Sequence, residues 1–207
     1  MKCFNCQTDN PDFARYCNEC GCDLKKVNDT TSKKFSHLHP YTPKFLIEKI
    51  LVDKCAMEGE RKQVTVFFAD VAGFTSMSDK LDPEQVHRVM DGAFRILMDE
   101  IHAYGGTINQ FTGDGVMALF GAPVAHEDHA RRACHAALAI RNSMVGYRQS
   151  VNNLFGVNFQ VRIGLNTGPV VIGCIGDDLR ADYTATGITV NVAARMESHA
   201  EPGTVLV

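Results

Sequence analysis

The sequence predicts an α+β fold in which helices cover a mainly antiparallel sheet. Strand-like runs occur in neighbouring pairs, helical stretches with an apolar stripe separate these pairs, and glycines mark the joins. From about residue 62 the expected order is β-α-β-β-α-β-β-α-β. Paired strands interrupted by helices are typical of an α+β sandwich.

The first predicted strand covers residues 63–71, a run rich in valine and phenylalanine. A helix is expected to begin after Asp82, because aspartate suits the cap, Pro83 suits the first helical position and acidic residues fill the first turn. The pair Gly105-Gly106 is expected to end this helix.

Two hairpins are predicted in the rest of the chain, each followed by a helix. The first turns at residues 112–115, where glycines flank Asp114. The second turns at Gly168-Pro169, a pair that marks turns. The remaining predicted elements are strands at 107–111, 116–120, 157–167, 170–175 and 204–207, and helices at 126–150 and 190–199.

The composition is that of a soluble globular protein, with 45% hydrophobic and 22% charged residues in a chain of 207. A net charge of −3 gives no bulk electrostatic case for nucleic acid as a partner. The start of the chain lacks the apolar stretch of a signal peptide, and no run approaches the roughly 20 apolar residues of a membrane span. We therefore expect a cytoplasmic protein with no nucleic-acid partner and no membrane span.

Paired cysteines near the start of the chain predict a zinc site. Cys3 and Cys6, then Cys17 and Cys20, form two Cys-x-x-Cys pairs, and two such turns supply the four sulfurs of a tetrahedral Zn²⁺ site. A segment this short has no core, so metal binding and folding are expected to be one event. Residues 1–24 are therefore predicted to be a zinc ribbon with one structural Zn²⁺.

Residues 25–58 are expected to form a linker and a helix. The stretch up to residue 42 is polar and poorly periodic, and Pro40 and Pro43 lie at its end. Residues 44–57 then show a partly amphipathic helical pattern.

Two aspartates, Asp70 and Asp114, each lie beside a strand-like run and next to glycine. Taken singly, either one is a good turn residue. Adjacent antiparallel strands would set them side by side, and two carboxylates so placed repel each other unless a cation lies between them. The pair is therefore a hypothetical site for two Mg²⁺ ions, which serve phosphoryl-type chemistry.

A polar pair on the last predicted helix adds to this hypothesis. Asn191 and Arg195 are four residues apart and so share one helix face. A neutral donor beside a guanidinium suits a sugar and a phosphate. The alternative is a solvated polar face on a surface helix.

Together these motifs resemble the class III nucleotidyl cyclases, the adenylate and guanylate cyclases, over residues 59–207. The matching stretches are residues 59–75, Gly113-Asp114-Gly115-Val116-Met117-Ala118 and residues 187–196. The resemblance implies a ferredoxin-like cyclase sandwich for this region. It also implies an enzyme that converts ATP into 3′,5′-cyclic AMP and pyrophosphate in cyclic-nucleotide signalling.

The resemblance further implies roles for individual residues. Two Mg²⁺ or Mn²⁺ ions per site would bind Asp70, Asp114 and the Val71 carbonyl. Asn191 would orient the ribose, and Arg195 would stabilise charge on the α-phosphate. The backbone amides expected to hold the phosphates are those of Ala72, Gly73, Phe74 and Thr75. In this family the aspartates and the Asn/Arg pair come from different subunits, which implies a head-to-tail homodimer.

Two positions are expected to contact the base, Gln110 and Thr184. Both side chains donate and accept hydrogen bonds, so they fit adenine or guanine. ATP is preferred on family grounds and GTP is the alternative. Two other functional hypotheses stay open. One is a regulatory module that binds nucleotide without turnover, and the other is a zinc-ribbon adaptor with an unrelated α/β domain.

The end of the chain departs from the family pattern. The resemblance places a phosphate-binding lysine and the last strands beyond Val207, so the catalytic domain is expected to be incomplete at its C-terminus. The expected consequence is weak or no activity for this chain alone.

Overall fold

The computed structural model describes residues 8–11, 18–19, 60–175 and 182–207. The chain divides into two compact units, Met1–Tyr41 and Thr42–Val207. The predicted Zn²⁺ ligands Cys3, Cys6, Cys17 and Cys20, and the helix expected at 44–57, lie outside the described residues. In the first unit the amide of Asn18 donates a hydrogen bond to the buried Asn10 side chain over 2.9 Å.

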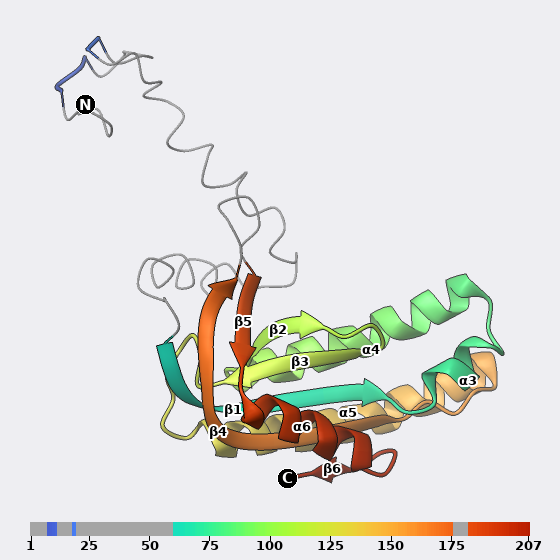
Figure 1. Ribbon diagram of the computed structural model, residues 1–207. Helices are drawn as coiled ribbons and strands as arrows, with labels where there is room; N and C mark the ends of the chain where they lie inside the picture. The colour runs from blue at the N-terminus through green and yellow to red at the C-terminus, as the bar shows by residue number, and fades with distance from the viewer. Residues whose placement is uncertain (1–7, 12–17, 20–59, 176–181) are drawn as a thin grey trace. The chain divides into compact units, whose positions relative to one another are not determined.

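The second unit is an α+β fold built on one six-stranded sheet (Figure 1). The strands are β1 (Glu60–Val71), β2 (Thr107–Phe111), β3 (Gly115–Phe120), β4 (Val161–Ile175), β5 (Asp182–Thr186) and β6 (Val205–Leu206), and the helices are α3 (Phe74–Ser78), α4 (Pro83–Ala103), α5 (His129–Phe155) and α6 (Ile188–His199). The strand order is β2-β3-β1-β4-β5 with antiparallel pairs, and β6 adds to β4 in parallel. The predicted fold class, mainly antiparallel with helices over the sheet, is confirmed.

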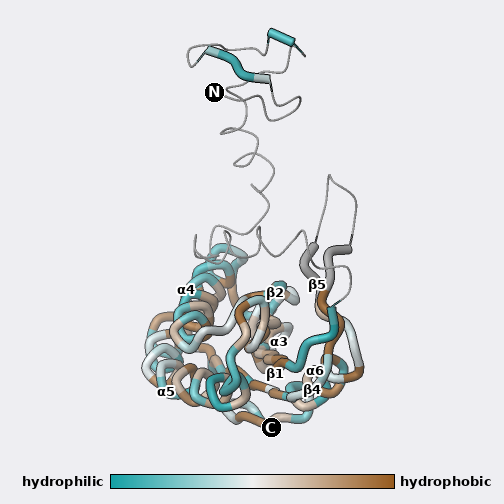
Figure 2. Tube along the Cα trace, turned by 90° about the vertical axis from the view of Figure 1, so that its left-hand side faces the viewer, coloured by the Kyte–Doolittle hydropathy of each residue, from teal (hydrophilic) through white to brown (hydrophobic). Residues whose placement is uncertain are grey.

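Alternation along β1 assigns each side chain to one of two layers. Phe67, Ala69 and Val71 enter the larger core beneath α4 and α5, whereas Val64 and Val66 enter a smaller core that also includes Ala193 of α6. This follows from the two-residue period of a strand. Figure 2 shows the resulting layers, with α4 and α5 on one side of the sheet and α6 on the other. Asp70 has the same parity as Val64 and Val66 and therefore lies on the α6 side.

The long helix α4 begins where the sequence predicts. Pro83 is its first residue, and the Asp82 amide donates to the Gln85 side chain over 3.1 Å. The β2–β3 hairpin is also confirmed, with the Thr112 amide donating to the Gly115 carbonyl over 2.9 Å. A short helix that was not predicted, α3, follows β1 directly.

The prediction of a hairpin at Gly168-Pro169 is wrong. Residues 161–175 form one continuous strand, β4, which pairs with β1 from Val161 to Ile172. Gly168 is needed for packing, because a Cβ there would lie 2.7 Å from the Thr189 hydroxyl. Pro169 is tolerated because β5 ends opposite Val171, leaving Pro169 with a strand neighbour on one side only. The hairpin partner of β4 is β5, which the sequence analysis missed.

The sheet curls so that its two ends meet. β2 and β5 are the end strands of the order given above, yet they approach each other closely, as Figure 1 also shows. Among the described residues there is no helix long and apolar enough to cross a membrane.

Candidate active site

The end of β1 brings Asp70 beside the β2–β3 hairpin. Asp70 lies directly opposite Gly115 in the antiparallel register, and Asp114 is the preceding residue of that hairpin. A Cβ on Gly115 would lie 2.6 Å from the Ala69 carbonyl oxygen and 3.1 Å from Asp70 Oδ1. Glycine is therefore required for the Asp70 carboxylate to reach the hairpin, and the two predicted metal-binding aspartates are neighbours.

The two carboxylates interact electrostatically. Burial raises the pKa of Asp114 above its ordinary value, and the negative charge of Asp70 raises it further. Two adjacent carboxylates of this kind attract divalent cations. The carboxylates of Asp70 and Asp114 are oxygen donors, the type of ligand that suits Mg²⁺ or Mn²⁺, and the carbonyl of Val71 stays a predicted third ligand.

Arg162 is part of this site, and sequence reasoning missed it. It faces Asp70 across the β1–β4 pair, and its Nη2 lies 2.9 Å from Asp70 Oδ2. The sequence signal that could have identified Arg162 is its charge, because it interrupts the otherwise apolar run 161–165. The guanidinium partly neutralises the aspartate pair from the side of β4.

Glu197 of α6 completes the charged cluster and was also missed. Its Oε1 lies 2.6 Å from Arg162 Nε, although the contact lacks hydrogen-bond geometry. Burial raises the pKa of Glu197 despite the opposing charge of Arg162, so desolvation outweighs the ion pair. The sequence signal was a carboxylate on the buried stripe Thr189, Ala193 and Glu197.

Asn191 and Arg195 lie on another face of α6. The buried stripe of this helix faces the sheet, whereas both predicted substrate-binding side chains are exposed. In the described part of the chain, no hydrogen bond or ion pair joins either of them to Asp70 or Asp114. One chain therefore presents the aspartates and the Asn/Arg pair on separate surfaces.

The segment after Asp70 turns sharply into α3. Gly73 has a φ of 71°, a left-handed conformation that favours glycine, and α3 begins at the next residue. The Ala72 amide donates to the Gln160 carbonyl over 2.9 Å. Of the amides expected to hold phosphates, those of Gly73, Phe74 and Thr75 at this helix start are left for that role.

The two predicted base-contacting positions lie on the strands that close the sheet. Gln110 is exposed on β2. Thr184 lies on β5, which approaches β2, but its side chain is outside the described part. The curl of the sheet therefore brings together the strands that carry these positions.

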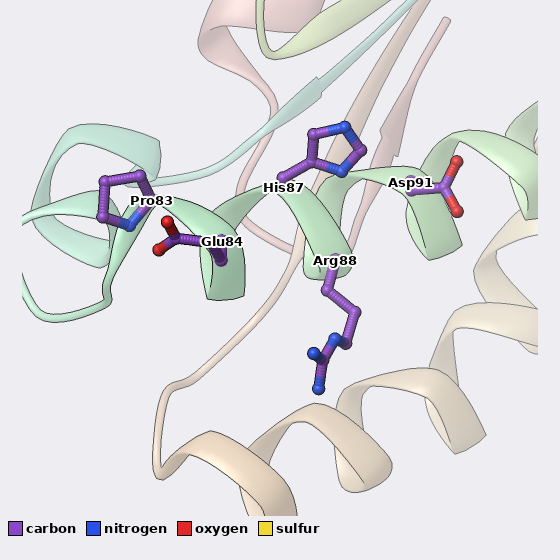
Figure 3. A pocket seen from close by; sticks show the side chains of 5 residues that line it. All are labelled: Pro83, Glu84, His87, Arg88 and Asp91. Carbon is purple, nitrogen blue, oxygen red and sulfur yellow. The ribbon is translucent and has the colours of Figure 1, made fainter.

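A pocket elsewhere on the surface has no part in this site. It is a hollow of about 510 Å³ lined by Pro83, Glu84, His87, Arg88 and Asp91. Figure 3 shows these side chains spread along α4, with His87 and Arg88 pointing in different directions. Because the polar groups come from one helix and do not converge, the charged cluster at Asp70 is the better candidate.

Comparison with known families agrees with this geometry. Residues 57–207 match the family model described as the adenylate and guanylate cyclase catalytic domain. Adenylate cyclase 1 of Rhizobium meliloti is 37% identical over 160 residues, which is 76% of this chain and 24% of that protein. The human guanylate cyclase soluble subunit beta-2 is 32% identical over 81% of this chain and 27% of its own length. The chain thus matches about a quarter of these curated relatives.

Solved structures of both enzyme types are similar to the chain. The adenylyl cyclase CyaB from P. aeruginosa aligns with a TM-score of 0.69 and 36% identity, covering 72% of this chain and 78% of that one. The guanylyl cyclase Cya2 aligns with a TM-score of 0.68 and 38% identity, covering 72% and 76%. The family model covers well over half of the sequence, and the chain therefore belongs to the adenylate and guanylate cyclase catalytic-domain family.

Proposed function

We propose that the protein converts ATP into 3′,5′-cyclic AMP and pyrophosphate, in cyclic-nucleotide signalling. The observation that carries this proposal is the Asp70–Asp114 pair, set side by side by the β1–β3 register and electrostatically coupled. Such a pair suits a cyclisation in which the ribose 3′-hydroxyl attacks the α-phosphate and pyrophosphate leaves.

Two Mg²⁺ or Mn²⁺ ions are the cofactors proposed for this site. Asp70, Asp114 and the Val71 carbonyl are the groups that would hold them. The ions would lower the pKa of the attacking hydroxyl and would place positive charge beside the phosphate oxygens. The chain's own contribution is to fix Asp70 on β1, where the core packing of Ala69 and Val71 anchors it, and to hold Asp114 in the adjoining turn of the β2–β3 hairpin.

A head-to-tail homodimer is proposed because Asn191 and Arg195 are exposed on α6, away from the sheet of their own chain. A second copy would supply this pair to the aspartates of the first, and twofold symmetry would then produce two equal sites. In this arrangement the Asn191 amide orients the ribose and the Arg195 guanidinium stabilises charge on the α-phosphate.

The leaving phosphates are assigned to the turn after β1. Gly73 is the N-cap of α3, and Phe74 and Thr75 are its first two residues. The amides at the start of a helix have no acceptor within the helix, so these three could accept phosphate oxygens as partners. The positive φ of Gly73 sets the direction of this turn.

GTP is the second candidate substrate, because the guanylyl cyclase Cya2 is as similar to the chain as the adenylyl cyclase CyaB. The Gln110 amide donates to adenine N1 or accepts from the guanine N1–H. The hydroxyl of Thr184 likewise suits the adenine amino group or guanine O6. We place ATP first because the adenylate cyclase of Rhizobium meliloti is 37% identical to the chain.

Product formation with Mn²⁺ and either ATP or GTP tests the proposal. We expect the purified chain to form a cyclic nucleotide slowly, in keeping with the weak activity expected above, and faster from ATP than from GTP. Asp70→Asn should lower this rate by about 100-fold or more. Asp79→Asn makes the same charge change at an exposed position after α3 and should leave the rate unchanged. Binding of ATP without any product would instead assign the chain to nucleotide-binding regulatory modules.

The paired cysteines remain proposed ligands of one structural Zn²⁺. Elemental analysis of the purified chain is expected to find one zinc per chain, because four thiolates bind this ion tightly. Replacing Cys3 and Cys6 together with serine should abolish it, whereas Cys134→Ser, at an exposed free cysteine in α5, should not. Equal zinc content in all three proteins would contradict the ribbon.

A further inference from the structure

Arg162 is held from three directions by groups of its own chain. Its Nη2 lies 2.9 Å from Asp70 Oδ2 and its Nε lies 2.6 Å from Glu197 Oε1. Its Nη1 donates to the Ser198 carbonyl over 3.5 Å. Two guanidinium nitrogens donate hydrogen bonds and the third lies within ion-pair distance of Glu197, so the orientation of this planar group is restricted.

The carboxylate that holds Arg162 is itself rigidly placed. Glu197 is only 8% exposed, and α6 packs directly on β4 at Gly164. A Cβ on Gly164 would overlap the Glu197 backbone nitrogen and lie 2.6 Å from the Ala193 carbonyl oxygen. Gly164 is two residues from Arg162 on the same strand, so Glu197 and Arg162 keep a constant separation.

These groups form a row of alternating charge. Asp70 and Glu197 are the negative ends, and Arg162 lies between them. In this row Glu197 competes with Asp70 for the guanidinium. Without the Glu197 charge, Arg162 would neutralise Asp70 alone and place an unshared positive charge beside any cation bound there.

We propose that Glu197 is a positioning residue that draws Arg162 away from full pairing with Asp70 and so keeps Asp70 available to a divalent cation. The inference rests on the proposed function, because it requires Asp70 to bind such a cation. The same ion pair links the aspartate to α6, the helix that bears Asn191 and Arg195.

Calorimetric titration of the whole chain with Mn²⁺, without nucleotide, tests this role. We expect Glu197→Gln to weaken Mn²⁺ binding about tenfold, the lower end of the effect of groups that support metal ligands. Glu201→Gln is the matched control. It removes the same charge two residues beyond α6, where the side chain is exposed, and should change the affinity less than about twofold.

A double variant separates this role from mere support of the fold. Once Arg162→Gln has removed the competing guanidinium, adding Glu197→Gln should cause no further loss of Mn²⁺ affinity. Arg162→Gln alone should bind Mn²⁺ at least as tightly as the wild type. If Glu197→Gln does not fold, Arg162→Gln still tests the inference, because its substitution lies on β4 and not on α6. Melting curves establish which variants are folded.

The outcomes distinguish a failure of the positioning role of Glu197 from a failure of the proposed function. Mn²⁺ binding that Asp70→Asn abolishes but Glu197→Gln leaves unchanged would overturn the positioning role alone. Weaker binding by Arg162→Gln than by the wild type would also overturn it. Wild-type Mn²⁺ binding that does not depend on Asp70 would contradict the proposed function, and the positioning role with it.

Discussion

At the residue scale, the site depends on a few side chains whose surroundings leave little freedom. Gly115 permits the Asp70 carboxylate to lie over the hairpin, and Arg162 holds it there. The sequence was sufficient to propose Asp70 and Asp114, because each ends a strand-like run beside glycine. It was not sufficient for Arg162 and Glu197, because their pairing depends on the β1–β4 register and on where α6 packs.

Gln110 is predicted to influence the selectivity between adenine and guanine. Gln110→Lys should raise the preference for ATP over GTP about tenfold or more, because an ammonium only donates and the guanine N1–H would be left facing a donor. Initial rates with each nucleotide measure this. Gln63→Lys, at another position of the sheet paired with Pro169, serves as a control that adds the same charge. An unchanged ratio in Gln110→Lys would remove this residue from the base-binding site.

A pH dependence of stability follows from His102. Burial lowers the pKa of this imidazole below its ordinary value of 6.5, against a smaller opposing effect of Asp99. As the pH falls through about 6.5 the unfolded chain binds a proton that the folded chain does not, so this contribution to stability is present above that pH and lost below it. Melting temperature should therefore fall between about pH 7.5 and pH 5.5. His102→Gln should show a smaller fall, and an equal fall in both proteins would contradict the assignment.

At the element scale, local signals predicted the helices α4, α5 and α6 and the β2–β3 hairpin, but not β4. Gly168-Pro169 has the local signature of a turn, but its position is set by the Thr189 hydroxyl, which donates to the Pro169 carbonyl over 2.7 Å. Glycine is needed at position 168 because of a tertiary contact with Thr189 on α6. A strand whose glycine and proline serve packing cannot be told from a turn by local pattern.

The contact between α6 and β4 predicts opposite effects of two glycine substitutions. Gly164→Ala should destabilise the fold by about 1–3 kcal/mol, because the new methyl group would meet the α6 backbone rather than a movable side chain. Gly146→Ala, in the exposed interior of α5 with open space around it, should stabilise by about 0.5–1 kcal/mol. Chemical denaturation measures both, and equal signs would contradict the packing described.

At the scale of the whole molecule, the two groups of predicted site residues lie on different elements. The aspartates lie at the end of β1 next to the β2–β3 hairpin, and Asn191 and Arg195 are exposed on the outer face of α6. The family resemblance of the motifs implied this division between subunits, and the exposure of the pair is consistent with it. The residue pattern of one chain does not predict which surfaces meet in an assembly, because that depends on how two folded copies fit together.

Mixing two inactive variants tests the central claim most directly. Asp70→Asn lacks one half-site and Arg195→Ala lacks the other, so each homodimer has no complete site. In a one-to-one mixture half of the dimers are mixed and each has one intact site of two, so cyclic AMP formation with Mn²⁺ should recover to about a quarter of the wild-type rate. A mixture that stays at the mean of its two parents would contradict a site shared between subunits.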